Sequence, residues 1–169
     1  MSHGTTLRLA EPRDAQAIAL LSRDHIEAGL GWKYDAARVT RAIRQRDTVV
    51  LAACERGAVV GFAVMEFGDE HAHLVLLAVQ PGRRRCGIGR ALVDWLTETA
   101  RTAGIASLHL ELRSNNEAAR RFYRALGFSE TVLLPRYYKG RESALRMIKL
   151  LRAPGPLPLP WRPPALGQK

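Results

Sequence analysis

Cysteine is scarce in this chain, which has two, Cys54 and Cys86, among 169 residues. The two lie in segments of different predicted structure, so we expect neither a disulfide framework nor a cysteine-based metal site. The sequence also lacks Cys and His pairs at the spacing that zinc requires. These absences predict a protein that binds no metal.

Long hydrophobic runs are missing as well. No apolar stretch of the sequence approaches the roughly 20 residues that a membrane helix needs. The N-terminal segment lacks the apolar core of a secretory signal. We therefore expect a cytoplasmic protein that does not enter a membrane.

Acidic residues are outnumbered, with 16 Asp and Glu against 26 Lys and Arg and a formal net charge of +10. Such a surplus attracts anions, among them nucleic acids and phosphate-bearing cofactors. The chain shows no nucleic-acid motif and no interleaving of aromatic and basic residues, so nucleic-acid binding is disfavoured. A basic nucleic-acid- or ribosome-binding module is thus the weaker alternative to an enzyme.

Hydrophobic periodicity predicts elements in the order β-α-α-β-β-β-α-β-α-β-β, a single α/β domain whose mixed, mostly antiparallel central sheet is flanked by helices. The run 73–79 is continuously apolar, which predicts a strand buried on both faces. The Ser-x-x-Glu pattern at Ser114 predicts a capping box that opens a helix. Another helix is expected to bury one stripe formed by Ile88, Leu92, Trp95, Leu96 and Thr99. We expect strands at 5–9, 48–54, 59–67, 73–79, 108–112, 128–134 and 143–150, and helices at 12–28, 35–45, 88–103 and 114–126.

The composition changes near residue 153. Residues 1–152 carry the periodic pattern of a folded domain, whereas 153–169 hold six of the nine prolines. Proline-rich segments favour extended conformations, so we expect a C-terminal tail. An alternative is that this tail lies across the partner subunit of a homodimer, anchored by Leu157, Leu159 and Trp161.

The segment from Val79 to Arg90 has the properties of a phosphate site. A predicted strand leads through a basic loop into a helix, where unpaired N–H groups and the helix dipole attract anions. Side chains at Gly87 or Gly89 would keep a pyrophosphate away from the backbone. Neither a Gly-Lys-Ser/Thr ending nor a G-x-G-x-x-G series is present, which disfavours P-loop and dinucleotide-binding proteins. The local pattern fits an ordinary basic helix start equally well.

Arg84-Arg85-Cys86-Gly87-Ile88-Gly89 matches the Q/R-x-x-G-x-G/A motif of the GCN5-related N-acetyltransferase (GNAT) superfamily. A preceding LLAV strand, a following GRAL and a downstream SNNEAARRFYRALGF extend the resemblance over 74–150. Within the superfamily the chain most resembles the ribosomal-protein alanine N-acetyltransferases, through LHLELRSNNEAARRFYRALGF and the later Arg136-Tyr137-Tyr138.

This resemblance implies that acetyl-CoA is the co-substrate and that its acetyl group moves to a primary amine by direct attack. The acceptor it implies is a protein N-terminal α-amine, with a small-molecule amine as the alternative. Asn116 would hydrogen-bond the pantetheine arm, although a purely helix-capping role is equally consistent with its position. The cofactor-binding residues that the resemblance implies are Leu77, Ala78, Val79, Arg84, Arg85, Cys86, Gly87, Ile88, Gly89, Arg90 and Asn116.

Two residues are candidate catalytic groups. Glu111 alternates with Leu110 and Leu112, so it points to the opposite face of its strand, and it matches the family's general base by position. Tyr123 follows Asn116 by two helical turns on the same helix face and is the candidate acid that protonates the departing thiolate. The alternatives are a solvated Glu111 paired with an arginine and a core tyrosine beside Phe122. A sensor that binds acyl-CoA without turnover is disfavoured, because both groups are present.

Four aromatic residues are candidates for the acceptor site. Tyr137 and Tyr138 match a tyrosine pair that lines the amine slot of N-terminal acetyltransferases, but they are also consistent with two aromatics at a strand edge. Trp32 and Tyr34 lie between the first two predicted helices, in a loop that shapes the acceptor site in this superfamily. The alternative for them is a hydrophobic plug.

Overall fold

Seven strands form one sheet in the order β1-β2-β3-β4-β5-β7-β6 in the computed structural model, which describes residues 4–152. Every neighbouring pair is antiparallel except β4 and β5, which confirms the predicted mixed sheet. The strands are β1 Thr5–Leu9, β2 Thr48–Glu55, β3 Ala58–Phe67, β4 His71–Val79, β5 Ser107–Arg113, β6 Ser129–Tyr138 and β7 Glu142–Leu150. The proposed tail and its anchors lie outside the described residues.

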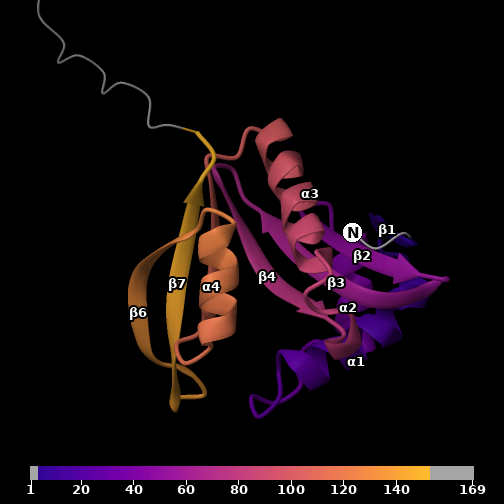
Figure 1. The fold of residues 1–169 in the computed structure, drawn as a ribbon, viewed down its shortest axis with the longest axis horizontal. Helices are drawn as coiled ribbons and strands as arrows, with labels where there is room; N and C mark the ends of the chain where they lie inside the picture. Colours follow the sequence, from indigo (N-terminus) through magenta and orange to yellow (C-terminus); the bar gives the residue numbers. More distant parts are fainter. Residues whose placement is uncertain (1–3, 153–169) are drawn as a thin grey trace, which may run out of the picture.

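Helices cover both faces of the sheet (Figure 1). The helices are α1 Ala15–His25, α2 Ala36–Arg44, α3 Ile88–Thr102 and α4 Glu117–Ala125. Residues of α3 and α4 pack into one hydrophobic cluster, and residues of α1 and α2 pack into a second cluster. The order of elements is the one predicted, although Pro12 opens a short 3-10 turn rather than α1 itself.

Strand β4 contributes to both clusters, so both of its faces are covered by the core, as predicted. Its residues alternate between buried and half-buried along the strand. Ala72 and Leu74 belong to the cluster under α3, whereas Leu76 and Ala78 belong to the cluster under α1 and α2. The β3–β4 register shifts beside Val64, and such a bulge turns the following side chains to the other face.

Strands β4 and β5 pair over a short distance. The parallel ladder joins His71–His73 to Ser107–His109, and the described strands have no further partners in it. Beyond His73 the sheet is therefore open between β4 and β5. This opening positions the site described below.

Helix α3 buries a stripe different from the predicted one. Ile88, Leu92 and Leu96 are buried as expected, but Trp95 is 37% exposed and Thr99 is only half-buried. Successive residues turn by about 100° around a helix, which puts Trp95 and Thr99 at one margin of the face centred on Leu92 and Leu96. The buried set is completed by Val93, Thr97 and Ala100.

The exposure of Trp95 leads to a testable expectation. Replacing Trp95 with Gln should change the free energy of unfolding by no more than about 0.5 kcal/mol, as is usual for surface positions. Urea unfolding measures this, with the fully buried Leu92→Ala as the control that must be clearly destabilised. A large loss for Trp95→Gln would show that this ring is part of the core.

Helix α4 begins later than the predicted capping box. Its N-cap is Asn116, whose Oδ1 accepts a hydrogen bond from the Ala119 N–H at 3.1 Å. Ser114 is not the cap, because its N–H donates to the Ser143 carbonyl at 3.0 Å and so prolongs the sheet. The end is as predicted: Gly127, with φ +88°, allows the Phe128 N–H to reach the Tyr123 carbonyl.

Candidate active site

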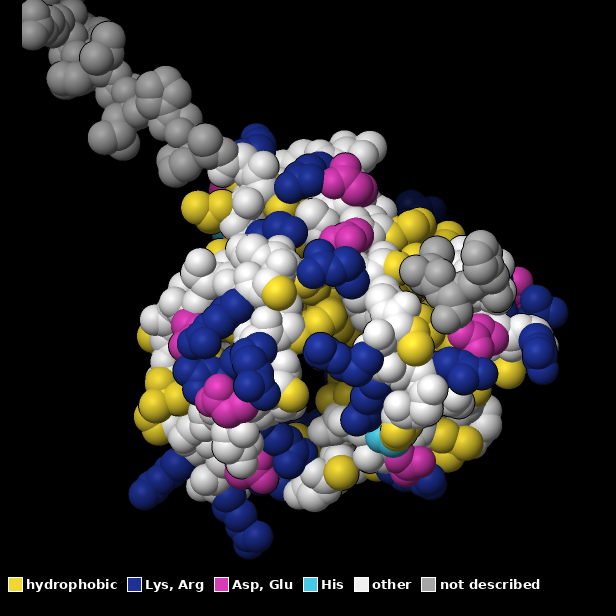
Figure 2. Space-filling model, in the orientation of Figure 1, with side chains coloured by type: hydrophobic (Ala, Val, Ile, Leu, Met, Phe, Trp, Pro, Cys, Tyr) yellow, Lys and Arg dark blue, Asp and Glu magenta, His cyan; other side chains and the backbone are white. Residues whose placement is uncertain are grey.

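The opening between β4 and β5 borders a cavity of about 330 Å³. Its walls come from the separated parts of β4 and β5, the start of α4, the end of β6 and the loop after α1. Figure 2 shows a hollow in the middle of this face with several Lys and Arg side chains around it. We call this the acceptor cavity, and Glu111, Tyr123 and Tyr138 line it.

A second cavity, of about 350 Å³, runs along the start of α3 and the exposed side of α4. The segments 77–79 and 83–85 line it, together with Gly89. We call it the cofactor groove. Both spaces are bordered by His25, Leu77, Asn116, Ala119 and Tyr123, so molecules bound in the two would meet beside these residues.

The loop between β4 and α3 presents a run of unpaired amides. Within the described part of the chain, the backbone N–H groups of residues 85–90 donate no hydrogen bond, and the first paired one is that of Ala91, which reaches the Gly87 carbonyl at 3.0 Å. Arg85 and Gly87 have φ values of +64° and +83°. Consecutive unpaired amides in such a turn form a concave nest that suits an anion.

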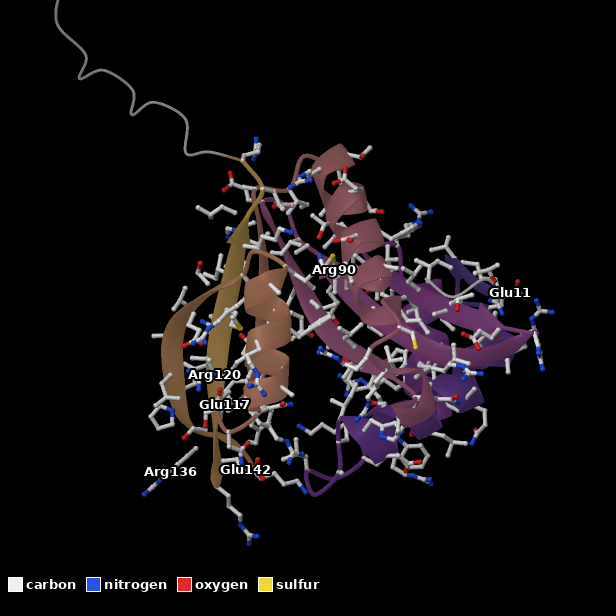
Figure 3. The ribbon with its side chains drawn as sticks, viewed as in Figure 1. Glu11, Arg90, Glu117, Arg120, Arg136 and Glu142 are labelled. Atoms are coloured by element: carbon white, nitrogen blue, oxygen red, sulfur yellow. The ribbon has the colours of Figure 1, made fainter. Side chains whose placement is uncertain are left out.

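The side chains of the loop between β4 and α3 have different roles. Arg84 is used structurally, because its Nε donates to the Val79 carbonyl at 3.1 Å and ties the loop to the end of β4. Ile88 is buried in the core, so its main chain alone can face a ligand. Cys86 is exposed and does not line the groove. Figure 3 shows Arg90 on the side of α3 that faces α4, where it lines an adjoining pocket with Arg121.

Gly89 lets the start of α3 approach Phe122 of α4 closely. A Cβ atom at Gly89 would lie 3.2 Å from Cζ of Phe122, which itself lines the groove. The Phe122 ring would have to shift within the space that the cofactor needs. The sequence-based reason for this glycine, access of pyrophosphate to the backbone, thus has a packing reason beside it.

We expect Gly89→Ala to raise the dissociation constant of acetyl-CoA about tenfold, which corresponds to about 1.4 kcal/mol and to the low end of overpacking costs. Isothermal titration calorimetry measures the constant. Gly82→Ala is the matched control, because a Cβ atom there meets nothing within 4 Å in the same loop. Equal affinities for the two variants would contradict the packing argument.

Glu111 lies on the face of β5 opposite its buried leucines, as the alternation predicted. Its side chain is 7% exposed, with Oε2 2.6 Å from Nε2 of His73 and Oε1 2.8 Å from Nε of Arg146. The hydrogen bond from His73 lowers the pKa of Glu111, and Arg146 adds to this effect against the opposing influence of burial. The alternative of a solvated, arginine-paired residue is therefore wrong about the solvation and right about the arginine.

Tyr123 is at once a core residue and a cavity residue. Its ring packs edge-on against Phe122 and Phe128, at centroid distances of 5.0 and 5.5 Å. Burial raises the pKa of the Tyr123 phenol well above its ordinary value. The hydroxyl group therefore stays protonated and can donate a hydrogen bond at any pH at which an enzyme normally works.

Asn116 satisfies both interpretations given above. Its Oδ1 caps α4 by accepting from the Ala119 N–H, and the residue also lines both cavities. Its Nδ2 makes no hydrogen bond with the described residues. Capping the helix thus fixes the side chain and leaves the amide donors for a ligand.

The structure brings one of the four predicted acceptor aromatics to the cavity. Tyr138 lines the cavity, and burial raises its pKa to about 12. Tyr137 stacks edge-on against it at 5.0 Å but is 49% exposed and does not line the cavity. The predicted pair therefore divides into one wall residue and one surface residue.

Trp32 and Tyr34 line neither cavity. The Trp32 indole N–H donates to the Tyr34 carbonyl at 3.0 Å, while the Tyr34 ring packs on the α1–α2 cluster. The hydrophobic-plug alternative therefore describes Tyr34 correctly. The same loop does reach the cavity, through the apolar residues Ile26, Ala28 and Leu30, which carry no sequence signal of their own.

Arg113 fixes this loop to the sheet. Its guanidinium donates to the carbonyls of Ile26 and Ala28 and lies 3.4 Å from a carboxylate oxygen of Glu142. Figure 3 shows Glu142 at the start of β7, near the loop. A buried carboxylate on Glu27 accepts from the Lys33 N–H at 2.7 Å and holds the loop from within. One wall of the cavity is thereby made rigid.

Comparison with known proteins identifies the family to which this chain belongs. A model described as the acetyltransferase (GNAT) family matches residues 15–128. The chain belongs to that family.

Three relatives are similar to this chain. A [ribosomal protein bS18]-alanine N-acetyltransferase of Escherichia coli K12 is 38% identical over 96 residues, 55% of this chain and 65% of the relative, so the match spans less than two thirds of that protein. A crystal structure of the ribosomal-protein-S18-alanine N-acetyltransferase from Escherichia coli is 30% identical, with a TM-score of 0.74, covering 89% of this chain and 96% of that one. A putative acetyltransferase from Salmonella typhimurium, solved with acetyl-CoA, shares the fold at 24% identity and a TM-score of 0.76, covering 91% and 98%.

Within residues 4–152, no helix is long and apolar enough to cross a membrane. The same residues also contain no group of three or more His, Cys, Asp or Glu side chains placed to hold a metal ion.

Proposed function

We propose that this protein is an acetyl-CoA-dependent N-acetyltransferase whose acceptor is a protein N-terminal α-amine, in a cytoplasmic location. The observation that carries the proposal is the junction of the two cavities. The cofactor groove begins at an amide nest and ends beside Tyr123, where the acceptor cavity with Glu111 begins. An acetyl donor and an amine bound in the two cavities would meet at that point.

The residues present suit acetyl-CoA. The amides of 85–90 would hold the pyrophosphate, and Arg85 adds positive charge beside them. Among the described strands, the edge of β4 that faces β5 has no partner beyond His73, so main-chain groups of 77–79 on that edge, other than the Val79 carbonyl held by Arg84, are available to the pantetheine arm. The free amide donors of Asn116 face the same space. A main-chain N–H at this edge would also stabilise the negative charge that develops on the acetyl oxygen.

The transfer itself needs few groups. The neutral amine attacks the acetyl carbon, a C–N bond forms and the C–S bond breaks. The amine's surplus proton passes to Glu111, directly or through one water molecule. The hydroxyl of Tyr123 donates a hydrogen bond to the departing sulfur. Since burial raises the phenol's pKa further above that of a thiol, this donor stabilises the thiolate, and full transfer of its proton would be uphill.

The electrostatics of Glu111 favour an α-amine over a lysine. An α-ammonium group has a pKa of about 7.7–8.0, against about 10.4 for a lysine side chain. The hydrogen bond from His73, together with Arg146, lowers the pKa of Glu111 and makes it a weak base. Such a base suffices for an amine that is already partly neutral near pH 7.5.

The proposal is tested by a screen of acetyl-CoA against peptides with free N-termini, the same peptides with blocked N-termini and one internal lysine, and small amines. Mass spectrometry should find acetylation at the free α-amines. Turnover with small amines and none with peptides would overturn the acceptor and support the alternative substrate class. Binding of acetyl-CoA without turnover of any amine would overturn the enzymatic function and support a sensor.

A further inference from the structure

Glu111 is held by two partners that differ in one property. Arg146 keeps its positive charge at every pH at which the protein is folded. Histidine, in contrast, is the side chain that changes its charge between about pH 5 and 8. The contact with His73 is the shorter of the two, at 2.6 Å against 2.8 Å. Of the two partners, His73 is thus both the closer one and the one whose residue type can change its charge.

His73 lies where β4 and β5 separate. It is the last residue of β4 in the parallel ladder, opposite His109. Its side chain is 44% exposed, whereas that of Glu111 is 7% exposed. His73 thus contacts solvent on one side and the Glu111 carboxylate on the other.

The neighbouring ionisable groups are occupied with one another. The Ser107 hydroxyl lies 2.9 Å from Nε2 of His109 and 3.2 Å from Nδ1 of His71. Burial lowers the pKa of His109, and the nearby His71 and His73 lower it further, so His109 stays neutral near pH 7. The charged and titratable groups around the His73–Glu111 pair are Arg146 on β7, Tyr138 on β6, His109 and Arg113 on β5, His71 on β4, and Glu66 on β3, which lies opposite His73 in the β3–β4 ladder.

We propose that His73 is a positioning residue of the acetyl-transfer reaction, which orients the carboxylate of Glu111 and weakens it as a base when the imidazole is charged. The inference rests on the proposed function, since it takes Glu111 as the base. A protonated His73 holds the carboxylate as an anion through a charge-assisted hydrogen bond, which makes Glu111 a poorer proton acceptor. A neutral His73 donates a weaker hydrogen bond, and Glu111 becomes the better base.

The consequence appears in the pH dependence of kcat/KM. Below neutrality kcat/KM of the wild type should fall more steeply than ionisation of the acceptor amine alone requires, so the slope of log(kcat/KM) against pH exceeds 1. His73→Gln keeps an N–H donor at the position of Nε2 but does not titrate in this range. We expect its slope to approach 1. His73→Leu removes the donor as well and should lower kcat about tenfold at pH 8, the scale of one well-placed hydrogen bond.

His71→Gln is the matched control. It removes a histidine two residues away on the same strand, whose contacts are with Ser107 and His109 rather than with Glu111. Its acid limb should keep the wild-type slope. An unchanged slope in His73→Gln, or the same change in His71→Gln, would overturn the inference.

A second measurement needs no turnover. In NMR titration of the Glu111 carboxyl carbon, the pKa of Glu111 should rise in His73→Gln and stay unchanged in His71→Gln. If Glu111→Gln retains full activity, the proposed function loses its base, whatever this titration shows. If Glu111→Gln is inactive but the Glu111 pKa does not respond to His73→Gln, the inference about His73 alone is overturned.

Discussion

Glu111→Gln is expected to lower kcat for an N-terminal peptide about a hundredfold at pH 7, the lower end of what a positioned general base contributes. The substitution removes the group that accepts the amine's proton and keeps the side-chain volume. The loss of kcat should become smaller above pH 8, because the α-amine then arrives neutral and Glu111 is needed only for the proton that leaves after the attack. Steady-state kinetics between pH 6 and 9 measures both effects.

The control for this variant is another carboxylate with the same kind of partners. Glu130 on β6 is bound by Arg120 and Arg124 of α4, away from the acceptor cavity. Glu130→Gln removes the same charge from a two-cation cluster and should leave kcat unchanged. Comparable losses in both variants would mean that Glu111 contributes through the fold rather than through proton transfer.

Tyr123→Phe is expected to lower kcat about tenfold to a hundredfold, within the range known for a single donor at a developing negative charge. The ring stays in place between Phe122 and Phe128, so the variant should fold and bind acetyl-CoA like the wild type. Comparing kcat with the dissociation constant of acetyl-CoA separates the two roles. A fall in affinity with unchanged kcat would assign the hydroxyl to cofactor binding.

The same hydroxyl group leads to an expectation for the rate of the wild-type enzyme at alkaline pH. Because burial raises the pKa of Tyr123, its proton is retained to higher pH than in a free phenol. The wild-type enzyme should therefore show no alkaline loss of rate from this group up to about pH 9.5, below even the ordinary phenol value near 10. A loss centred near pH 8 would require another ionising group.

Local features of this protein could be predicted from the sequence because they depend on neighbouring residues. Asp35 caps α2, accepting from the Arg38 N–H at 2.8 Å, and aspartate is one of the residues preferred at that position. Gly127 ends α4, and the alternation around Glu111 placed it on the correct face. The unpaired amides after Arg84 follow from a loop that enters a helix, whatever the rest of the fold.

The features that could not be predicted depend on contacts between distant segments. Ser114 has the sequence of a helix cap, but pairing with Ser143 draws it into the sheet. Tyr34 is turned to the α1–α2 cluster by the buried carboxylate of Glu27, which accepts from its N–H. The meeting of His73 with Glu111 needs the parallel β4–β5 pairing, for which periodicity gives no register.

The short pairing of β4 with β5 also affects the stability of the protein. Three residue pairs join β4 to β5 and so connect β1–β4 with β5–β7, which leaves two internal edges in place of a continuous ladder. An extended molecule lying between them would supply the missing partners and join the two halves. The free energy of unfolding should then increase with ligand concentration as RT ln(1 + [L]/Kd), with the co-substrate acting as a removable strand of its own enzyme.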